Sequence, residues 1–266
     1  MRIATWNVNS IRSRIDRLEA WLGRSDVDVL AIQETKTRVD QFPLARLQAL
    51  GYEVAHHGVN QWNGVAILSR VGLTEVTEGF PGMPSWGQPP VAEARALGAT
   101  CGGIRLWSIY APNGRHIADP HMDYKIAWLS ALRDEAARWL AADPQAQVAL
   151  MGDWNIAPLD EDVWSMAFYL DKSHVSPRER AAFGAIVEAG YADVVRPHAP
   201  GPGVYTYWDY QQLRFPKKQG MRIDFVLASP GLAARVQGAA IDRQERKGTG
   251  ASDHAPVVVD LADPTG

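Results

Sequence analysis

Residues 148–155 read Val-Ala-Leu-Met-Gly-Asp-Trp-Asn, an apolar run that ends abruptly in acid and amide side chains. A short apolar run that stops at turn-forming residues is typical of a buried strand. Runs of the same design stand at residues 3–7, 29–34 and 252–259, each with Asn, Glu, Asp or His at one end. A single charged group at a strand end is ordinary, because strands emerge into water. Several ends that carry only these residue types predict a catalytic rim.

Length and composition limit the domain organisation. The chain has 266 residues, 46% of them hydrophobic, which suits one large domain or two small ones. If the polar ends of the four runs serve one site, the two ends of the chain must meet. The Pro/Gly-rich stretches at 79–90 and 197–203 are then surface loops rather than linkers, and residues 1–266 form a single domain.

Cysteine content and hydropathy bear on the cellular setting. The lone Cys101 excludes an intramolecular disulfide and a multi-cysteine zinc site, and we expect it to be a small core residue. The chain enters its first expected strand directly after Met1, without a signal-peptide pattern, and no apolar run approaches the ~18 residues of a membrane span. We expect a soluble cytoplasmic monomer that binds no membrane.

Periodicity and turn chemistry predict a mixture of helices and strands. Apolar residues recur at helical spacing over 11–22 and 124–139. Residues 176–179, Ser-Pro-Arg-Glu, combine a capping box with proline at the first helical position, and Gly190 should stop that helix. Strands are expected near 2–6, 27–32, 64–69, 103–110, 147–152, 204–208, 222–228 and 255–260. Because the strands between about 52 and 110 follow one another without helices, we expect a mixed α/β sandwich with antiparallel pairing.

Charge gives a weaker signal. The formal net charge of −3 provides no general attraction to polyanions. Basic residues nevertheless alternate with aromatic ones around residues 213–222, and three arginines follow the first motif. This pattern suits a groove that tracks a nucleic-acid backbone, although a solvated loop would look the same. The residues concerned are Arg214, Lys217, Lys218, Arg222, Arg12, Arg14 and Arg17.

Oxygen ligands at the strand ends suit a hard cation. Glu34, with neighbouring oxygens from Asn7 and Asp253, fits Mg²⁺, which binds few protein groups and keeps several waters. Asp153 and Asn155 are two residues apart, so in an extended segment they project to the same side. One could then activate a water while the other orients it. A turn is the alternative for this stretch, because Gly, Asp and Asn all favour turns.

A second acid stands inside an apolar run. Asp224 lies within the expected strand at 222–228, and a buried Asp needs a partner. An imidazolium is a natural one, and His254 is the candidate. The pair Asp253-His254 could equally be a turn that contains a satisfied core histidine.

Six motifs, taken in order, resemble those of the exonuclease III family of abasic-site endonucleases. They stand at 6–12, 33–36, 110–113, 152–155, 222–224 and 252–256 and cover nearly the whole chain. The resemblance implies a four-layer α/β sandwich, with two packed mixed, largely antiparallel sheets flanked by helices and a divalent metal at one edge. It also implies a hydrolase that uses Mg²⁺, with Mn²⁺ as a substitute. Such an enzyme cleaves duplex DNA 5′ to abasic sites and removes nucleotides or blocking groups from 3′ ends.

The resemblance assigns roles to individual residues. Asp153 resembles the acid that activates the attacking water or protonates the leaving oxygen, and Asn155 the amide that positions nucleophile and phosphate. His254, oriented by Asp224, resembles the imidazole that stabilises the pentacovalent state. Tyr110 resembles the tyrosine that hydrogen-bonds a phosphate oxygen. The metal ligands implied are Asn7, Glu34, Asp153, Asn155, Asp253 and His254.

Substrate contacts follow from the same resemblance. The expected DNA contacts are Arg12, Asn113, Arg115, Lys217 and Lys218, and the expected pocket for a flipped-out abasic sugar comprises Tyr207, Trp208, Met221 and Ile223. A strand of core aromatic residues is the alternative for the pocket segment. Asn9 replaces an acid and Met221 a tryptophan found in some members, which leaves open the number of metals and the balance of endonuclease and exonuclease activity.

Two other classes of function share parts of this pattern. A phosphoesterase acting on lipid or inositol phosphates would have the same metal and His-Asp residues but different specificity loops. A non-catalytic nucleic-acid-binding relative would lack chemistry, whereas every motif residue needed for chemistry is present here.

Overall fold

The computed structural model describes residues 1–263, and in that part of the chain twelve strands form two six-stranded sheets. The first sheet has the order β11-β12-β1-β2-β4-β3, with bounds Val236–Ile241, Val257–Leu261, Arg2–Asn7, Val29–Gln33, Val65–Ser69 and Glu53–His57. The second has the order β5-β6-β7-β8-β10-β9, with bounds Thr74–Glu78, Ala96–Cys101, Ile104–Tyr110, Val148–Asp153, Asp224–Ala228 and Ala192–Asp193.

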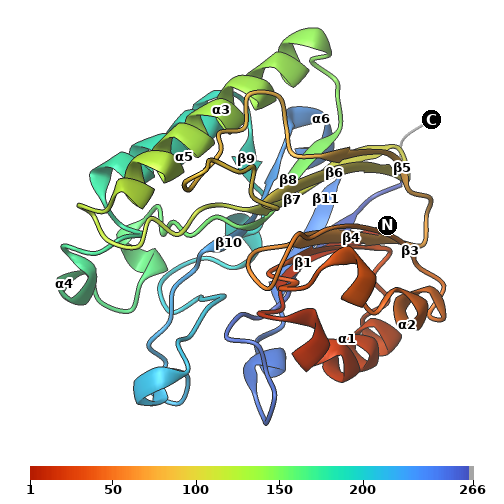
Figure 1. Cartoon of the computed structure of the whole chain (residues 1–266), viewed down its shortest axis with the longest axis horizontal. Helices are drawn as coiled ribbons and strands as arrows, with labels where there is room; N and C mark the ends of the chain where they lie inside the picture. Colours follow the sequence, from red (N-terminus) through yellow and green to blue (C-terminus); the bar gives the residue numbers. More distant parts are fainter. Residues whose placement is uncertain (264–266) are drawn as a thin grey trace.

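Helices cover the outer faces of both sheets. The α-helices are α1 (Ile11–Ser25), α2 (Leu44–Gln48), α3 (Pro120–Ala142), α4 (Met166–Tyr169), α5 (Pro177–Glu188) and α6 (Pro230–Ala233). Helices α1 and α2 lie against the first sheet, and α3 and α5 against the second (Figure 1). The expected four-layer sandwich is therefore confirmed.

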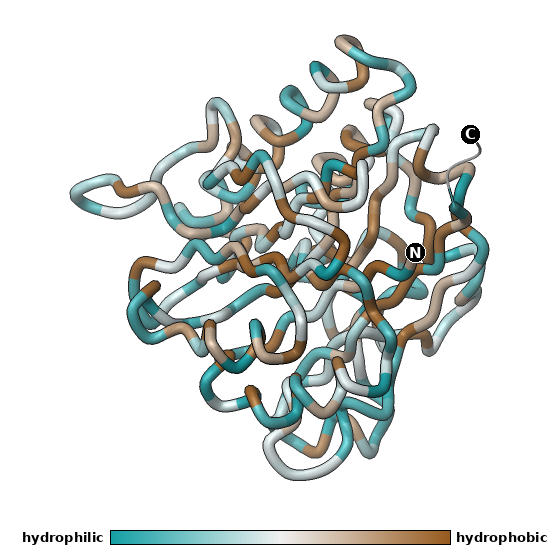
Figure 2. The backbone as a smooth tube through the Cα atoms, turned by 90° about the vertical axis from the view of Figure 1, so that its right-hand side faces the viewer, coloured by the Kyte–Doolittle hydropathy of each residue, from teal (hydrophilic) through white to brown (hydrophobic). Residues whose placement is uncertain are grey.

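The core explains why the strands are apolar along their whole length. In β8, Met151 belongs to the apolar cluster between the two sheets, whereas its neighbour Leu150 packs with Trp128 of α3 on the other face. Successive strand residues point to opposite faces, and here both faces are covered. Figure 2 shows hydrophobic residues gathered along the inner strands and hydrophilic ones along the peripheral loops.

Connectivity brings the two ends of the chain together. Strand β1 pairs antiparallel with β12, with Thr5 opposite Val257, and parallel with β2 through the crossover helix α1. The second sheet contains the same kind of crossover, because helix α3 joins the parallel strands β7 and β8. The other pairings are antiparallel, so the prediction of mixed, largely antiparallel sheets is confirmed.

Local sequence signals were accurate for helices and less so for strands. The helices expected over 11–22, 124–139 and after Ser176 form, and the capping box between Ser176 and Glu179 is present. The strand expected at 204–208 was wrong. Tyr207 instead makes isolated bridges to both Met221 and His254, so this segment ties two others together. Strands β3, β5, β6, β9 and β11 were not predicted.

Two smaller expectations concern Cys101 and the membrane. Cys101 is buried in the core between the sheets, as predicted. Among residues 1–263, no helix is both long enough and apolar enough to cross a membrane.

Candidate active site

The strand ends converge at one edge of the sandwich. In the second sheet, Tyr110 and Asp224 both stand opposite Asp153 in the strand register. In the first sheet, Asn7 ends β1 beside β2, and Glu34 follows β2 directly. Because the two sheets pack face to face, these five side chains reach the same space.

Asp224 holds His254 as the sequence predicted. The Asp224 Oδ2 atom lies 2.8 Å from Nδ1 of His254, and the opposite ring nitrogen, Nε2, lies 3.7 Å from Oδ2 of Asp153. Burial alone would lower the pKa of His254, but the carboxylates of Asp224 and Asp153 outweigh it and raise that pKa to about 10. The imidazole is therefore a buried cation between two acids at neutral pH.

Asp153 is the most perturbed acid of the site. Burial raises the pKa of its carboxyl to about 7, with help from the charges of Asp224 and Glu34 and against the opposing effect of His254. The amide of Asn7 bridges the two sheets here, donating to Asp153 Oδ2 at 2.9 Å and to Glu34 Oε1 at 2.8 Å. A carboxyl with a pKa near 7 can accept and release a proton at physiological pH.

Three ionisable side chains converge at a candidate metal site, where the two carboxylates are the expected ligands because a cationic imidazole has no free lone pair. A carboxylate oxygen of Glu34, a carboxylate oxygen of Asp153 and a ring nitrogen of His254 all lie within 4.8 Å of one another. The Glu34 carboxylate also pairs with Lys36 at 2.6 Å, and although burial alone would raise the pKa of Glu34, this ammonium lowers it. Asp253 is not one of these three residues, and its Oδ1 accepts a hydrogen bond from Asn9 at 3.0 Å.

Tyr110 presents a protonated hydroxyl beside the acids. Burial and the nearby charge of Glu34 raise the pKa of Tyr110 well above its usual range. The Arg95 guanidinium lies 4.9 Å from the centre of the Tyr110 ring. The phenol is thus kept as a hydrogen-bond donor.

The amide side of the site differs from the sequence expectation. Strand β8 ends at Asp153, and Asn155 adopts a left-handed backbone (φ 52) in a turn closed by its own N–H and Asp153 Oδ1 at 2.9 Å. The extended geometry expected for this pair was therefore wrong, and the turn alternative is the one that forms. The Asn155 side chain accepts from Asn113 at 3.1 Å and donates to the carbonyl of Ala111 at 3.0 Å.

Sequence reasoning missed His174. Its Nε2 atom lies 3.2 Å from Oδ1 of Asn155 and 3.4 Å from Nδ2 of Asn113. Burial and the Lys125 charge lower the pKa of His174 to about 4, so the ring is neutral. It lies in an irregular segment before α5, where no periodicity or motif marks it.

A family model described as the endonuclease/exonuclease/phosphatase family matches residues 4–254, a range that includes every strand-end side chain above. The chain belongs to this family. Exodeoxyribonuclease III of Haemophilus influenzae is 29% identical over an alignment of 268 positions, which covers 97% of this chain and 98% of that protein.

Solved structures resemble this family member over almost its whole length. A 3′ phosphatase from Neisseria, determined with a product DNA hairpin, has a TM-score of 0.91 at 34% identity, covering 98% of this chain and 99% of that one. An AP endonuclease from Archaeoglobus fulgidus has a TM-score of 0.90 at 33% identity, with coverage of 98% and 99%. These relatives confirm the resemblance to the exonuclease III family.

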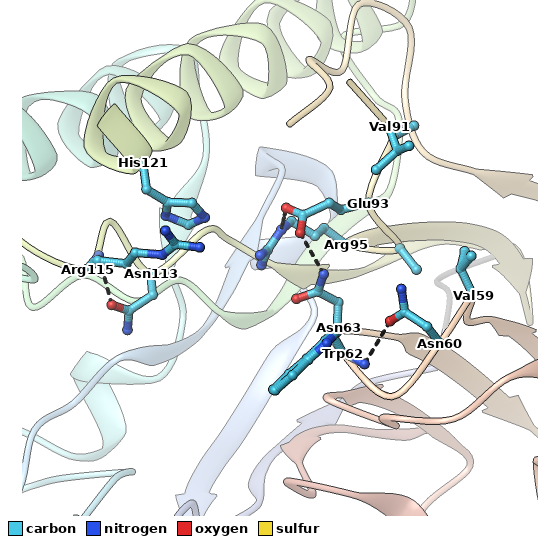
Figure 3. Close-up of a pocket in the computed structure, with 12 residues that line it drawn as sticks. Val59, Asn60, Trp62, Asn63, Val91, Glu93, Arg95, Asn113, Arg115 and His121 are labelled. Atoms are coloured by element: carbon cyan, nitrogen blue, oxygen red, sulfur yellow. Dashed lines mark hydrogen bonds and ion pairs between the residues drawn. The ribbon is translucent and has the colours of Figure 1, made fainter. Parts of the chain in front are cut away.

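The expected DNA contacts lie on the surface of this endonuclease/exonuclease/phosphatase fold. Arg12, Arg115, Lys217 and Lys218 are exposed, and Asn113 is half-buried. Asn113 and Arg115 line one wall of a cavity of about 530 Å³, with Trp62 on the opposite wall (Figure 3). Their positions suit a substrate that extends away from the acids.

Arg222 departs from the surface interpretation. It is buried and pairs with Asp162 at 2.7 Å and Asp193 at 2.6 Å. The sequence grouped it with Lys217 and Lys218 as a candidate for tracking DNA. Its guanidinium instead ties three chain segments together.

The expected abasic pocket is divided in this structure. Tyr207, Met221 and Ile223 share one apolar cluster, and the Tyr207 ring lies 4.9 Å from the ring of His254. Trp208 belongs to a different cluster, with Tyr205, so it packs apart from the other three. Among the four, Tyr207 alone is partly exposed.

Proposed function

We propose that this protein is a Mg²⁺-dependent DNA-repair phosphodiesterase that works as a single-domain monomer. It cleaves duplex DNA 5′ to abasic sites and removes nucleotides or blocking groups from 3′ ends, leaving a 3′-hydroxyl. The observation that carries the proposal is the buried acid–imidazole cluster of Glu34, Asp153, Asp224 and His254 at one edge of the two sheets.

The relatives favour DNA as the substrate. Those named above are an exodeoxyribonuclease, a 3′ phosphatase and an AP endonuclease, and the phosphatase was determined with a DNA hairpin. No observation in this chain favours a lipid or inositol phosphate instead. The exposed basic residues and Asn113 are the proposed contacts with the DNA backbone.

The residues present fit a magnesium ion. Glu34 and Asp153 are the proposed carboxylate ligands, with Asn7 beside both. Carboxylate and amide oxygens are the ligands that Mg²⁺ prefers. A bound Mg²⁺ would offset negative charge on the phosphate. Asn155, Asp253 and His254 remain proposed as further contributors near the ion.

The chain's own groups can move the protons that hydrolysis requires. Asp153 takes a proton from the attacking water, whose oxygen forms a bond to phosphorus as the bond from phosphorus to O3′ breaks. The departing O3′ takes up one proton from solvent water and becomes the 3′-hydroxyl, and Asp153 later releases its proton to solvent. The imidazolium of His254 and the hydroxyl of Tyr110 both donate toward phosphate oxygens, where negative charge increases in the transition state.

Lesion choice would come from the apolar cluster beside His254. An apolar pocket without partners for base edges suits a sugar that has lost its base, because such a sugar leaves the helix most easily. Tyr207, Met221 and Ile223 are the proposed wall. Tyr207 is the member whose ring contacts the catalytic imidazole.

A gel assay tests this function. End-labelled duplexes that carry an internal abasic analogue, a 3′-phosphate or an unmodified 3′ end are incubated with the protein in Mg²⁺ or in chelator, beside an Asp153→Asn control. We expect Mg²⁺-dependent incision 5′ to the lesion and removal of the 3′ block. No cleavage of any duplex, or cleavage that Asp153→Asn retains, would reject the proposal.

A further inference from the structure

A fully buried lysine contacts the amide side of the site, by which we mean Asn113, Asn155 and His174. Lys125 of α3 has no exposed surface. Its ammonium donates to the backbone carbonyls of Asn113 at 3.2 Å and Asn155 at 2.6 Å, and to Oε1 of Glu179. An ammonium has three donors, so all of them are used. Two of the three hold the backbones of Asn113 and Asn155, whose side-chain amides bond to each other.

Glu179 of α5 completes the arrangement. It is also fully buried, and its Oε1 accepts from the backbone N–H of His174 at 2.9 Å. Its other oxygen, Oε2, accepts from the hydroxyl of Ser176 at 2.6 Å, within the capping box of α5. The pair of Lys125 and Glu179 therefore touches the backbone of all three residues on the amide side.

Stability alone does not account for this choice of residues. Taking an ammonium and a carboxylate out of water is costly, and apolar residues of similar volume often serve the fold equally well. An apolar side chain, however, could not bind two carbonyl oxygens from different loops. Asn155 also holds a left-handed backbone, with φ 52, that needs support from its surroundings.

We propose that Lys125 and Glu179 are positioning residues that align the Asn113 and Asn155 amides for the substrate phosphate. The inference rests on the proposed function for its catalytic part. Lys125 draws the two loops together through their carbonyls, and Glu179 keeps the ammonium charged and fixes the His174 backbone. Misplacing groups in an active site by about 1 Å can cost on the order of 100-fold in rate.

Three variants separate positioning from folding. Lys125→Met and Glu179→Gln each remove one charge, and the double variant removes both. Each single variant should lower Tm, because it leaves its partner buried without a counter-charge. The double variant should recover Tm relative to Lys125→Met. Its kcat on abasic duplex should stay at least about 10-fold below the parent with KM nearly unchanged, because no group holds the carbonyls.

Leu132→Ala is the matched control, since Leu132 is fully buried in the same helix, seven positions beyond Lys125, and has no polar side-chain atom that could hold the carbonyls. It should lower Tm while leaving kcat unchanged. If kcat in the double variant recovers together with Tm, the ion pair is only structural and the inference is overturned. If the double variant does not fold, the ion pair is required for folding. The inference is then also overturned, because it assumes that Lys125→Met and Glu179→Gln together replace the pair without loss of the fold.

A second measurement does not depend on turnover. The side-chain amide resonances of Asn113 and Asn155 in ¹⁵N–¹H spectra should shift in Lys125→Met and in the double variant, but not in Leu132→Ala. Unchanged resonances in the double variant would reject the positioning role. A parent protein that cleaves no DNA while these resonances shift as expected would reject the proposed function and leave the alignment of the amides standing.

Discussion

The two sides of the site are held in place by different means. The acid side, formed by Glu34, Asp153, Asp224 and His254, stands at or near strand ends. Ladder hydrogen bonds set the backbone of Asp153 and Asp224, whereas Glu34 follows β2 with a left-handed backbone, φ 54. The amide side, formed by Asn113, Asn155 and His174, stands on loops. Two of its members have left-handed backbones, with φ 52 and φ 83, and a buried ion pair from two helices supports it.

The difference extends to charge. On the acid side, burial raises the pKa of Asp153 to about 7, and the carboxylates of Asp224 and Asp153 raise the pKa of His254 to about 10 against the effect of burial. On the amide side, the side chains that face the substrate are neutral. The strand-end acids are held by one another and by Asn7 and Lys36, whereas the backbones of the loop residues are held by the buried pair of Lys125 and Glu179.

The largest expected effect is on the acid side. Asp153→Asn and His254→Ala should each lower kcat by at least ~100-fold, because each removes a proton-transfer or charge-stabilising group. Burial raises the pKa of Asp153, so the folded state disfavours its charged form, and Asn should keep or raise Tm at pH 8. Steady-state kinetics and thermal melts test both points. Near-normal turnover in either variant removes that residue from the mechanism.

The next effect tests whether strand backbone sets the acid side. Gly152 precedes Asp153 with φ 147, and a Cβ there would lie 1.9 Å from the carbonyl oxygen of Ile109. Gly152→Ala should therefore lower the free energy of unfolding by about 2 kcal/mol or more and reduce activity with it.

Gly23→Ala in α1 is the control for that variant. No atom lies within 4 Å of the added methyl, so this change should stabilise the protein by about 0.5–1 kcal/mol in urea titrations. Equal effects of the two substitutions would mean that the β8 backbone is not the support of Asp153.

Metal dependence gives a smaller effect on the acid side. Glu34→Ala should raise the Mg²⁺ concentration for half-maximal activity by at least about 10-fold, since the carboxylate faces the ion. DNA binding in chelator should change much less, because Glu34 does not face the substrate backbone. An unchanged Mg²⁺ titration contradicts the ligand assignment.

The smallest effect lies outside both sides, on the exposed loop that carries Lys217 and Lys218. Neither side chain makes a hydrogen bond or ion pair within residues 1–263. If they contact phosphates, removing both should flatten the plot of log affinity against log salt by up to roughly two units, at about 0.9 per phosphate.

Binding of the Asp153→Asn protein to abasic duplex across a salt series measures this slope. Arg133→Ala with Arg138→Ala removes the same charge from α3 and should leave the slope unchanged. Parallel lines for the parent and the double lysine variant would show that the loop is only solvated.

The sequence predicted the acid side of the site better than the amide side. The acid side could be predicted because each member stands beside an apolar run, and a buried Asp224 demands a cationic partner. Asn155 was assigned to the site, but the role expected for it assumed an extended segment, although the composition of residues 152–155 taken in isolation favoured the turn that forms. His174 carried no signal, because its role depends on contacts with residues 19 and 61 positions away.

The sequence pattern also did not distinguish buried basic and aromatic residues from exposed ones. Arg222 and Lys217 look alike in the sequence, yet Arg222 is buried between Asp162 and Asp193. Likewise, residues 204–208 have strand-like composition, but Tyr207 bonds to two segments that approach from different sheets. A pattern of residue types cannot show which segments will flank it.

The four layers were implied only by the resemblance to a known family, whereas the sequence patterns by themselves determined the mixed α/β sandwich, the helix cap at Ser176, the chemistry of the strand ends and the Asp224–His254 pair. These features depend on periodicity, on capping within four residues, and on the cost of burying an unpaired charge. Only the tertiary structure decided the pKa of Asp153, the burial of Arg222, and the support of Asn113 and Asn155 by Lys125. Each of these depends on which layers meet, since burial and Coulomb interactions are set by neighbours that lie tens of residues away along the chain.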